Sequence, residues 1–133
     1  MENYIAAMFS TLEDARGAAA ALVELSRHGK VQLHRAGLYH RGERGEYVSE
    51  DSGTGAVTQL AVSDFPKTTD GTAALDLERV LTPGMHALLA HVEETDPRPV
   101  NEAMDAFDGV VYRRSVEQIE TSARHPSGPS RLE

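Results

Sequence analysis

The chain contains no cysteine, and this absence excludes disulfides, thiolate metal sites and cysteine nucleophiles. It contains no tryptophan either, and aromatic residues make up only 5% of its 133 residues, so its core must consist mainly of Ala, Val, Leu, Met and Ile. No stretch approaches the roughly 18 consecutive apolar residues that span a bilayer. The N-terminus lacks the basic region of a signal peptide. These absences predict a soluble cytoplasmic protein that does not associate with a membrane.

Basic charge is also scarce. The chain has 13 Lys and Arg against 21 Asp and Glu, and its net charge is -8. The densest basic stretches, residues 34–44 and 113–114, are interleaved with or followed by acidic residues. Such a surface repels phosphate backbones, so nucleic acid is not an expected partner. The glycines at 53–55 lack the flanking strand and helix, and the Lys-Ser/Thr pattern, of a phosphate-binding loop. We therefore predict no cofactor.

The first thirty residues predict a strand followed by a helix. Residues 3–9 are an apolar run typical of a buried strand. Ser10 is the expected N-cap of the helix, and Glu13 stands three residues later, as in a capping box. Small and apolar residues then recur at helical spacing. Gly29 follows the last turn, where a left-handed residue commonly ends a helix.

The next twenty residues predict a β-hairpin. Residues 31–40 alternate as a strand does, and residues 46–50 are expected to pair with them. If Glu43 and Arg44 form the tip of the turn, then His40 faces Tyr47 across the two strands. Alternation also predicts that His34 and His40 lie on the same side of the sheet, because six positions separate them.

The rest of the chain divides into an insert, three further elements and a tail. In the insert, residues 51–83, we expect a short strand or turn at 56–62 and two helical turns at 73–81. The patterns that follow predict a strand, a helix, a strand and a closing helix over residues 85–94, 97–107, 110–114 and 115–123. Residues 124–133 are rich in Pro, Ser and Gly and predict a disordered tail.

Without the insert, the order of elements is β-α-β-β-α-β. This is the order of ferredoxin-like α+β domains, in which an antiparallel sheet carries both helices on one face. We predict a single domain over residues 1–123, with the hairpin strand and the insert as additions. The face of the sheet opposite the helices is expected to be uncovered. Such a face is closed by dimerisation or forms the floor of a cavity.

Two stretches resemble a bacterial family of unknown function, whose members are often described as stress-associated or membrane proteins. They are YIAAMFSTLEDARGAAAALVELSRHGKVQLHRAGLYHRGERGEYVSE and LTPGMHALLAHVEETDPRPVNEAMDAFDGVVYRRSVEQIE. Family members also have a Thr-Pro-Gly before an apolar strand and a Phe-x-Gly before the last strand. They usually carry a glycine-rich apolar hairpin in the middle, where this chain has the polar FPKTTDGTAALDLERV. The resemblance implies an α+β fold but no reaction.

The six histidines raise the question of a metal site. His34 and His40 would be roughly 20 Å apart along a strand, whereas both ring nitrogens must lie about 2.1 Å from a shared ion. His34 is better placed to join His86 or His91, if the strands at 31–40 and 85–94 are neighbours. These two have opposite parity, so at most one joins His34. The sequence predicts no specific metal site.

Acid–base catalysis is the remaining chemistry. Histidine titrates near neutrality, and the weak candidates for a proton-transferring group are His34, His86, His91 and Tyr47. The alternative for each is an ordinary polar residue on a solvated sheet face, and Arg113 is interpreted in the same way, as a solvated charge. Of the histidines, His34 is nearest the middle of the predicted sheet.

Two functions remain open. The first is a regulatory module without catalysis, which forms a homodimer through its sheet and binds a small molecule or a partner protein. The second is a small metal-free cavity enzyme of the isomerase or cyclase type, which uses His or Tyr to move a proton on a hydrophobic metabolite. A flat apolar sheet face would favour the first, and a pocket lined by a strand histidine would favour the second.

Overall fold

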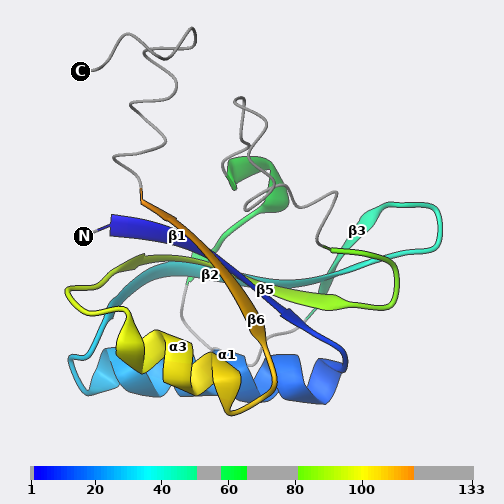
Figure 1. The fold of residues 1–133 in the computed structure, drawn as a ribbon. Coiled ribbons are helices and arrows are strands. Elements are labelled where there is room, and N and C mark those ends of the chain that lie inside the picture. Colours follow the sequence, from blue (N-terminus) through cyan, green and yellow to red (C-terminus); the bar gives the residue numbers. More distant parts are fainter. Residues whose placement is uncertain (1, 51–57, 66–80, 116–133) are drawn as a thin grey trace, which may run out of the picture.

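The computed structural model describes residues 2–50, 58–65 and 81–115. Figure 1 shows these segments as helices and strands. Their bounds are β1 (Glu2–Phe9), α1 (Leu12–Arg27), β2 (Gln32–Arg41), β3 (Tyr47–Glu50), β4 (Thr58–Gln59), the 3-10 turn η1 (Val62–Asp64), β5 (His86–Glu93), α3 (Arg98–Asp105) and β6 (Val110–Ser115).

One six-stranded sheet organises the described chain. Its main path runs in the order β3-β2-β5-β1-β6, and every neighbouring pair on that path is antiparallel. The two-residue β4 pairs with β2 in parallel, next to β3. Both α1 and α3 lie on one face of the sheet (Figure 1). The predicted α+β class, with an antiparallel sheet and helices on one face, is confirmed.

The N-cap of α1 lies one residue later than expected. Thr11 is the N-cap residue, and its hydroxyl accepts a hydrogen bond of 3.1 Å from the backbone N–H of Asp14. The prediction of Ser10 as the cap is therefore wrong. Gly29, with φ of +73°, follows the helix as expected. The face of α1 toward the sheet is built from small residues and one leucine: Ala15, Ala18, Ala19 and Leu22. Small side chains let the helix lie close to the sheet.

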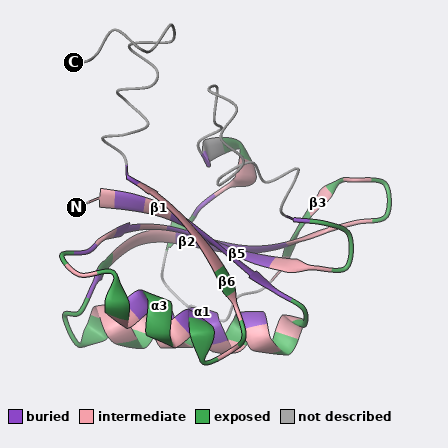
Figure 2. Ribbon diagram, in the orientation of Figure 1, coloured by how far each residue is buried: buried purple, intermediate pink, exposed green. Residues whose placement is uncertain are grey.

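The core has two parts, one on each face of the sheet. The first part joins both helices to Phe9, Leu38, Leu88 and Val92. The second part lies on the opposite face, where Leu60, Phe65 and Leu81 pack against Met8 and Leu89. The central strands are buried along most of their length, whereas the outer faces of the helices are exposed (Figure 2).

The face away from the helices is thus covered in part by the chain itself. Leu60 and Leu81 are fully buried there, and the Tyr39 hydroxyl donates a 2.7 Å hydrogen bond to the Leu60 carbonyl. The expectation of an uncovered face is wrong for the described residues. The physical reason is that the insert returns a short apolar segment, 58–65, to the sheet edge, where β4 pairs with β2.

A polar network centred on the buried Glu94 joins the end of β5 to β1, α3 and β6. Glu94 is 4% exposed, and its carboxylate accepts hydrogen bonds from Asn3 at 2.6 Å and from Arg113 at 2.5 and 3.3 Å. Arg113 also donates to the Asn101 side chain at 2.8 Å. Arg113 is therefore an ion-pairing residue joining β6 to α3 and to the end of β5, and the interpretation of a solvated charge is wrong.

Other predictions concern residues that the structure does not describe. The disordered tail at 124–133 lies outside the described residues. The same holds for all but one residue of the helical turns at 73–81 and of the closing helix at 115–123. Of the short strand or turn expected at 56–62, residues 56 and 57 lie outside the described residues, and β4 (Thr58–Gln59) is the part that forms a strand. Among the described helices, none has the length and apolar character required to cross a membrane.

Candidate functional site

His34 occupies a β-bulge, and this changes which histidines meet. Leu33 and Arg35 pair with consecutive residues of β5, so His34 between them is an extra residue. A bulge of this kind interrupts the alternation of side chains along a strand. His34 lies on the face away from the helices and His40 lies on the helix face. The expectation that the two share one side of the sheet is wrong.

His34 instead joins an aromatic cluster on the face away from the helices. Its ring centroid is 4.9 Å from that of His91, which stacks on Tyr4 at 4.5 Å with an interplanar angle of 7°. Phe65 meets the other side of this group through an edge contact with Tyr4 at 5.8 Å. Nε2 of His91 lies 3.0 Å from a carboxylate oxygen of Glu2. Of the two histidines on β5, it is His91 that joins His34.

Burial sets the protonation of His91. Its side chain is 15% exposed. Loss of solvent lowers the pKa of His91 below its usual 6.5, and the neighbouring His34 and Arg35 lower it further, while Glu2 opposes the shift. The structure thus favours the neutral form of His91. A neutral, stacked imidazole of this kind fits a packing role.

The β2–β3 hairpin has a three-residue loop. Gly45 has φ of +87°, and its N–H bonds to the Gly42 carbonyl at 2.9 Å. Arg41 therefore pairs with Tyr47, and every further pair is shifted by one residue from the prediction. The predicted two-residue tip is wrong because Glu and Arg disfavour the left-handed conformations of a two-residue turn, whereas Gly45 adopts one readily.

This shift separates Tyr47 from His40. A slip of one residue moves a side chain to the opposite face of a sheet. Tyr47 packs at the margin of the second core part, and the Arg41 guanidinium lies 5.6 Å from its ring centroid. His40 lies opposite Val48 instead. Tyr47 is therefore not paired with His40.

The same shift brings Glu50 to two histidines. Nδ1 of His86 lies 2.7 Å from Oε2 of Glu50, and Nδ1 of His40 lies 3.2 Å from the same oxygen. His40 and His86 are directly opposite each other on β2 and β5, while Glu50 comes from β3. We call His40, Glu50 and His86 the imidazole–carboxylate triad. It lies on the helix face of the sheet, because Glu50 pairs with Leu38, whose side chain packs in the first part of the core.

The triad is half-buried and only partly satisfied by hydrogen bonds. The side chains of Glu50, His86 and His40 are 13%, 19% and 34% exposed. Nδ1 of His40 is buried and makes no aligned hydrogen bond, although a Glu50 oxygen is within 3.2 Å. The separation is short enough for a hydrogen bond but the ring is turned off the line. The Nδ1 atoms of two imidazoles thus lie within 3.2 Å of one carboxylate oxygen, which forms an aligned hydrogen bond with only His86.

The sequence reasoning missed Glu50. Ten residues separate it from His40, and only the length of the turn decides whether the two share a face. A usable signal was present in Gly45, because a glycine at the third loop position is typical of three-residue hairpins. His86 was a candidate, but for a site with His34 on the other face of the sheet.

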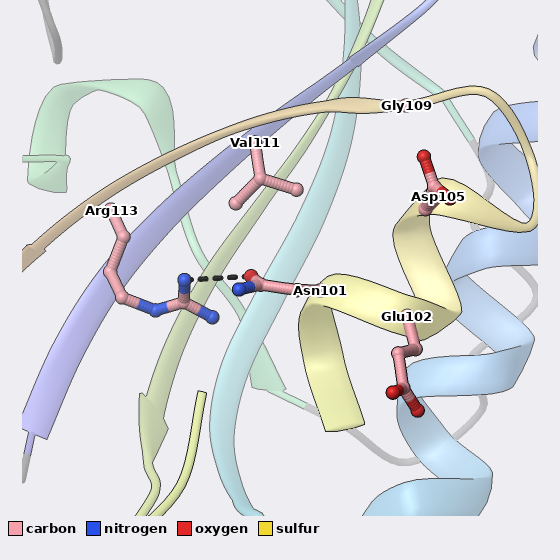
Figure 3. Close-up of a pocket in the computed structure, with 6 residues that line it drawn as sticks. All are labelled: Asn101, Glu102, Asp105, Gly109, Val111 and Arg113. Carbon is pink, nitrogen blue, oxygen red and sulfur yellow. Dashed lines mark hydrogen bonds between the residues drawn. The ribbon is translucent and has the colours of Figure 1, made fainter. Parts of the chain in front are cut away.

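A shallow groove of about 430 Å³ between α3 and β6 is a second surface feature. Figure 3 shows its lining residues, with Arg113 joined to Asn101 at one end and the carboxylates of Glu102 and Asp105 at the other. The Arg113 guanidinium is already engaged by Glu94. Its one lining cation is therefore already engaged in the fold, and its other charged groups are the two exposed carboxylates of Glu102 and Asp105.

In comparisons with known proteins, no family model, no curated protein and no solved structure matches the chain.

Proposed function

We propose that the chain is a ferredoxin-like βαββαβ domain that works as a regulatory binding module. Removal of β3 and β4 leaves the sheet order β2-β5-β1-β6, with α1 and α3 on one face. This arrangement supports the ferredoxin-like interpretation. Small domains of this architecture host many unrelated functions, so the function must be argued from the site.

The observation that carries the binding role is the convergence of the imidazole–carboxylate triad. Three titratable side chains from three strands meet at one carboxylate oxygen, and His40 retains solvent contact. Strands that are fixed in register hold such groups in place without a ligand. The triad is therefore the ligand site that we propose for the module.

The alternative of a metal-free cavity enzyme has less support. That hypothesis placed a hydrophobic metabolite in a pocket on the face opposite the helices, lined by His34 or another strand histidine. In the described part of that face, Leu60, Leu81 and Leu89 fill the space as fully buried side chains. His34 and His91 pack among aromatic rings there. The binding module is consequently the function that the geometry supports best.

A thermal-shift panel tests the binding role. The probes are Zn²⁺, inorganic phosphate, acetate and imidazole, and circular dichroism follows unfolding of the full chain and of His86→Asn. We expect at least one probe to raise the Tm of the wild type by several degrees, since a ligand at about 100 times its Kd stabilises by about 2.7 kcal/mol. The same probe should not shift the variant. A panel with no effect that depends on His86 would contradict the proposal.

We also propose that the module forms a homodimer through its sheet. The described part of the face opposite the helices is covered, so the edge strand β6 is the better surface. Val110 on β6 is 54% exposed, and β6 ends the strand order. Edge strands of this kind can pair with a second copy.

Sedimentation equilibrium at micromolar concentration tests the dimer. We expect the mass of two chains for the wild type and of one chain for Val110→Asp. Val48→Asp is the matched control, because Val48 is 37% exposed on β3 at the opposite edge of the sheet. A wild-type monomer would contradict the dimer, and a monomer for Val48→Asp alone would move the interface to the other edge.

We propose, finally, that the chain belongs to the bacterial, stress-associated family that it resembles, and that it is cytoplasmic. The support is the resemblance of its two halves to that family and its acidic, cysteine-free composition. Fractionation of cells that express the full chain tests the location, and recovery in the membrane pellet would contradict it.

A further inference from the structure

We infer that the ligand of the imidazole–carboxylate triad is a divalent transition-metal ion of the Zn²⁺ class. This inference rests on the proposed function, because it names the ligand of the same site. His40, Glu50 and His86 are the only group of three potential ligands whose ligand atoms all lie within 4.8 Å of one another in the described residues. Two histidines and one carboxylate also form a known ligand set of zinc and of non-haem iron.

The distances in the triad are close to those of a metal shell. Ligands that lie about 2.1 Å from an ion are separated by roughly 3.0–3.4 Å from one another in octahedral or tetrahedral geometry. The separations from Oε2 of Glu50 are 3.2 Å to His40 and 2.7 Å to His86. For these two separations an ion requires displacements of only a few tenths of an ångström, and the nitrogens of the two histidines lie within 4.8 Å of each other.

The unsatisfied nitrogen of His40 is an independent observation in favour of an ion. Buried polar atoms are nearly always hydrogen-bonded, and an exception calls for an explanation such as a bound ion. Nδ1 of His40 is buried, faces the Glu50 carboxylate and has no aligned hydrogen bond. A cation between these two atoms accepts the nitrogen lone pair and neutralises the carboxylate, so it satisfies both at once.

The donor chemistry selects the class of ion. Ca²⁺ and Mg²⁺ prefer shells made of oxygen, and the chain has no thiolates to favour Cu⁺. Imidazole nitrogen with one carboxylate suits Zn²⁺, Co²⁺, Ni²⁺ and Fe²⁺. With three protein ligands, at least one position of the ion is left for water or an added ligand.

The opposite face supplies a matched control. His34, His91 and Glu2 are again two histidines and one glutamate, and His91 contacts both of the others. Their potential ligand atoms nevertheless do not converge within the distance that the triad satisfies. If zinc binds to any histidine-rich surface, both the triad and the group of His34, His91 and Glu2 contribute to binding. If zinc binds specifically to the triad, substitutions in the second group leave binding unchanged.

Isothermal titration calorimetry of the chelator-washed full chain with Zn²⁺ tests the inference. We expect one ion per chain, and binding at least ~100-fold weaker in Glu50→Gln and in His86→Asn, more than the 10–100-fold that loss of an outer-shell partner costs. The control His34→Asn/His91→Asn should keep the stoichiometry and affinity of the wild type. Co²⁺ should give a visible absorption spectrum in the wild type and control, and none in Glu50→Gln.

The outcomes separate this inference from the proposed function. Zinc binding that survives His40→Asn/His86→Asn, or that disappears in the His34→Asn/His91→Asn control, overturns the triad as the metal site. If zinc does not bind, but phosphate, acetate or imidazole still raises the Tm through His86, the metal inference fails and the binding module stands. If no probe acts through His86, both fail. Circular dichroism confirms that each variant folds, and Glu50→Asp replaces Glu50→Gln if the latter does not.

Discussion

At the scale of single residues, the protonation of His91 affects the free energy of unfolding. His91 is packed on Tyr4 and beside His34, and its pKa is lowered mainly by burial. The ionisable groups that face it are Glu2, which favours its protonation, and Arg35 and His34, which oppose it. The unfolded chain therefore binds a proton at a higher pH than the folded chain does.

The free energy of unfolding should fall as the pH drops below about 6.5, the usual pKa of histidine. The sign follows because the folded pKa is the lower one: the stability is present above pH 6.5 and is lost as the pH falls through the folded value. Urea unfolding at intervals from pH 8 to pH 5 measures it. His91→Gln, which does not titrate, should show a shallower decline. An equally steep decline in the variant would show that other groups cause it.

Arg113 is the second residue with a measurable effect. Its removal takes an ion pair and two hydrogen bonds from the buried Glu94 carboxylate, which keeps its hydrogen bond from Asn3. We expect Arg113→Ala to lower the free energy of unfolding by about 3 kcal/mol, since a buried charge that loses its partner is costly. Arg98→Ala is the control: its ion pair with Asp96 is exposed to solvent, so its loss should leave the free energy of unfolding nearly unchanged. Equal effects in urea unfolding would contradict the distinction.

At the scale of elements, the hydrophobic periodicity of the sequence predicted which segments form helices and strands. It was less successful in predicting on which face of the sheet each side chain lies. The strand expected at 85–94 is β5 (His86–Glu93), and the helix expected after Pro97 is α3. What the sequence did not reveal were two single-residue events in β2 and its hairpin: the bulge at His34 and the extra loop residue at Gly45. Each reverses the facing of a strand without altering its composition. The triad depends on this facing, so it was not predictable from alternation.

Gly37 controls the attachment of β4 to β2. A Cβ at this position would meet the Leu60 carbonyl oxygen at 2.5 Å and the Tyr39 ring at 2.7 Å. Gly37→Ala should therefore destabilise the protein by about 1–3 kcal/mol, although alanine usually suits a strand better than glycine does. Hydrogen exchange offers a local measurement, because the Leu60 amide donates to the Ala36 carbonyl. We expect that amide to lose protection. Unchanged protection would show that β4 accommodates the methyl group.

At the scale of the whole molecule, both parts of the core pack against the same sheet, one on each face. The first has helices behind it and contains Leu88, while the second has the segment 58–65 and Leu81 behind it and contains Leu89. Leu88 and Leu89 are neighbours on β5 and face opposite ways. Because one strand supports both parts, loosening one part should be transmitted to the other through the sheet. The domain is therefore expected to unfold as one unit.

Truncation of one leucine on each face tests this cooperativity. Leu60 and Leu88 are both fully buried, with exposed fractions of 0% and 1%. We expect Leu60→Ala and Leu88→Ala each to lower the global free energy of unfolding by about 2–5 kcal/mol, from lost burial and from the cavity that remains. Val48→Ala, at a site that is 37% exposed, should cost well under about 1 kcal/mol. Urea unfolding followed by circular dichroism measures all three, with the m-value as a check on two-state behaviour. If Leu60→Ala leaves the global transition unchanged and only abolishes hydrogen-exchange protection near β4, the second part of the core is a local unit that opens separately from the sheet.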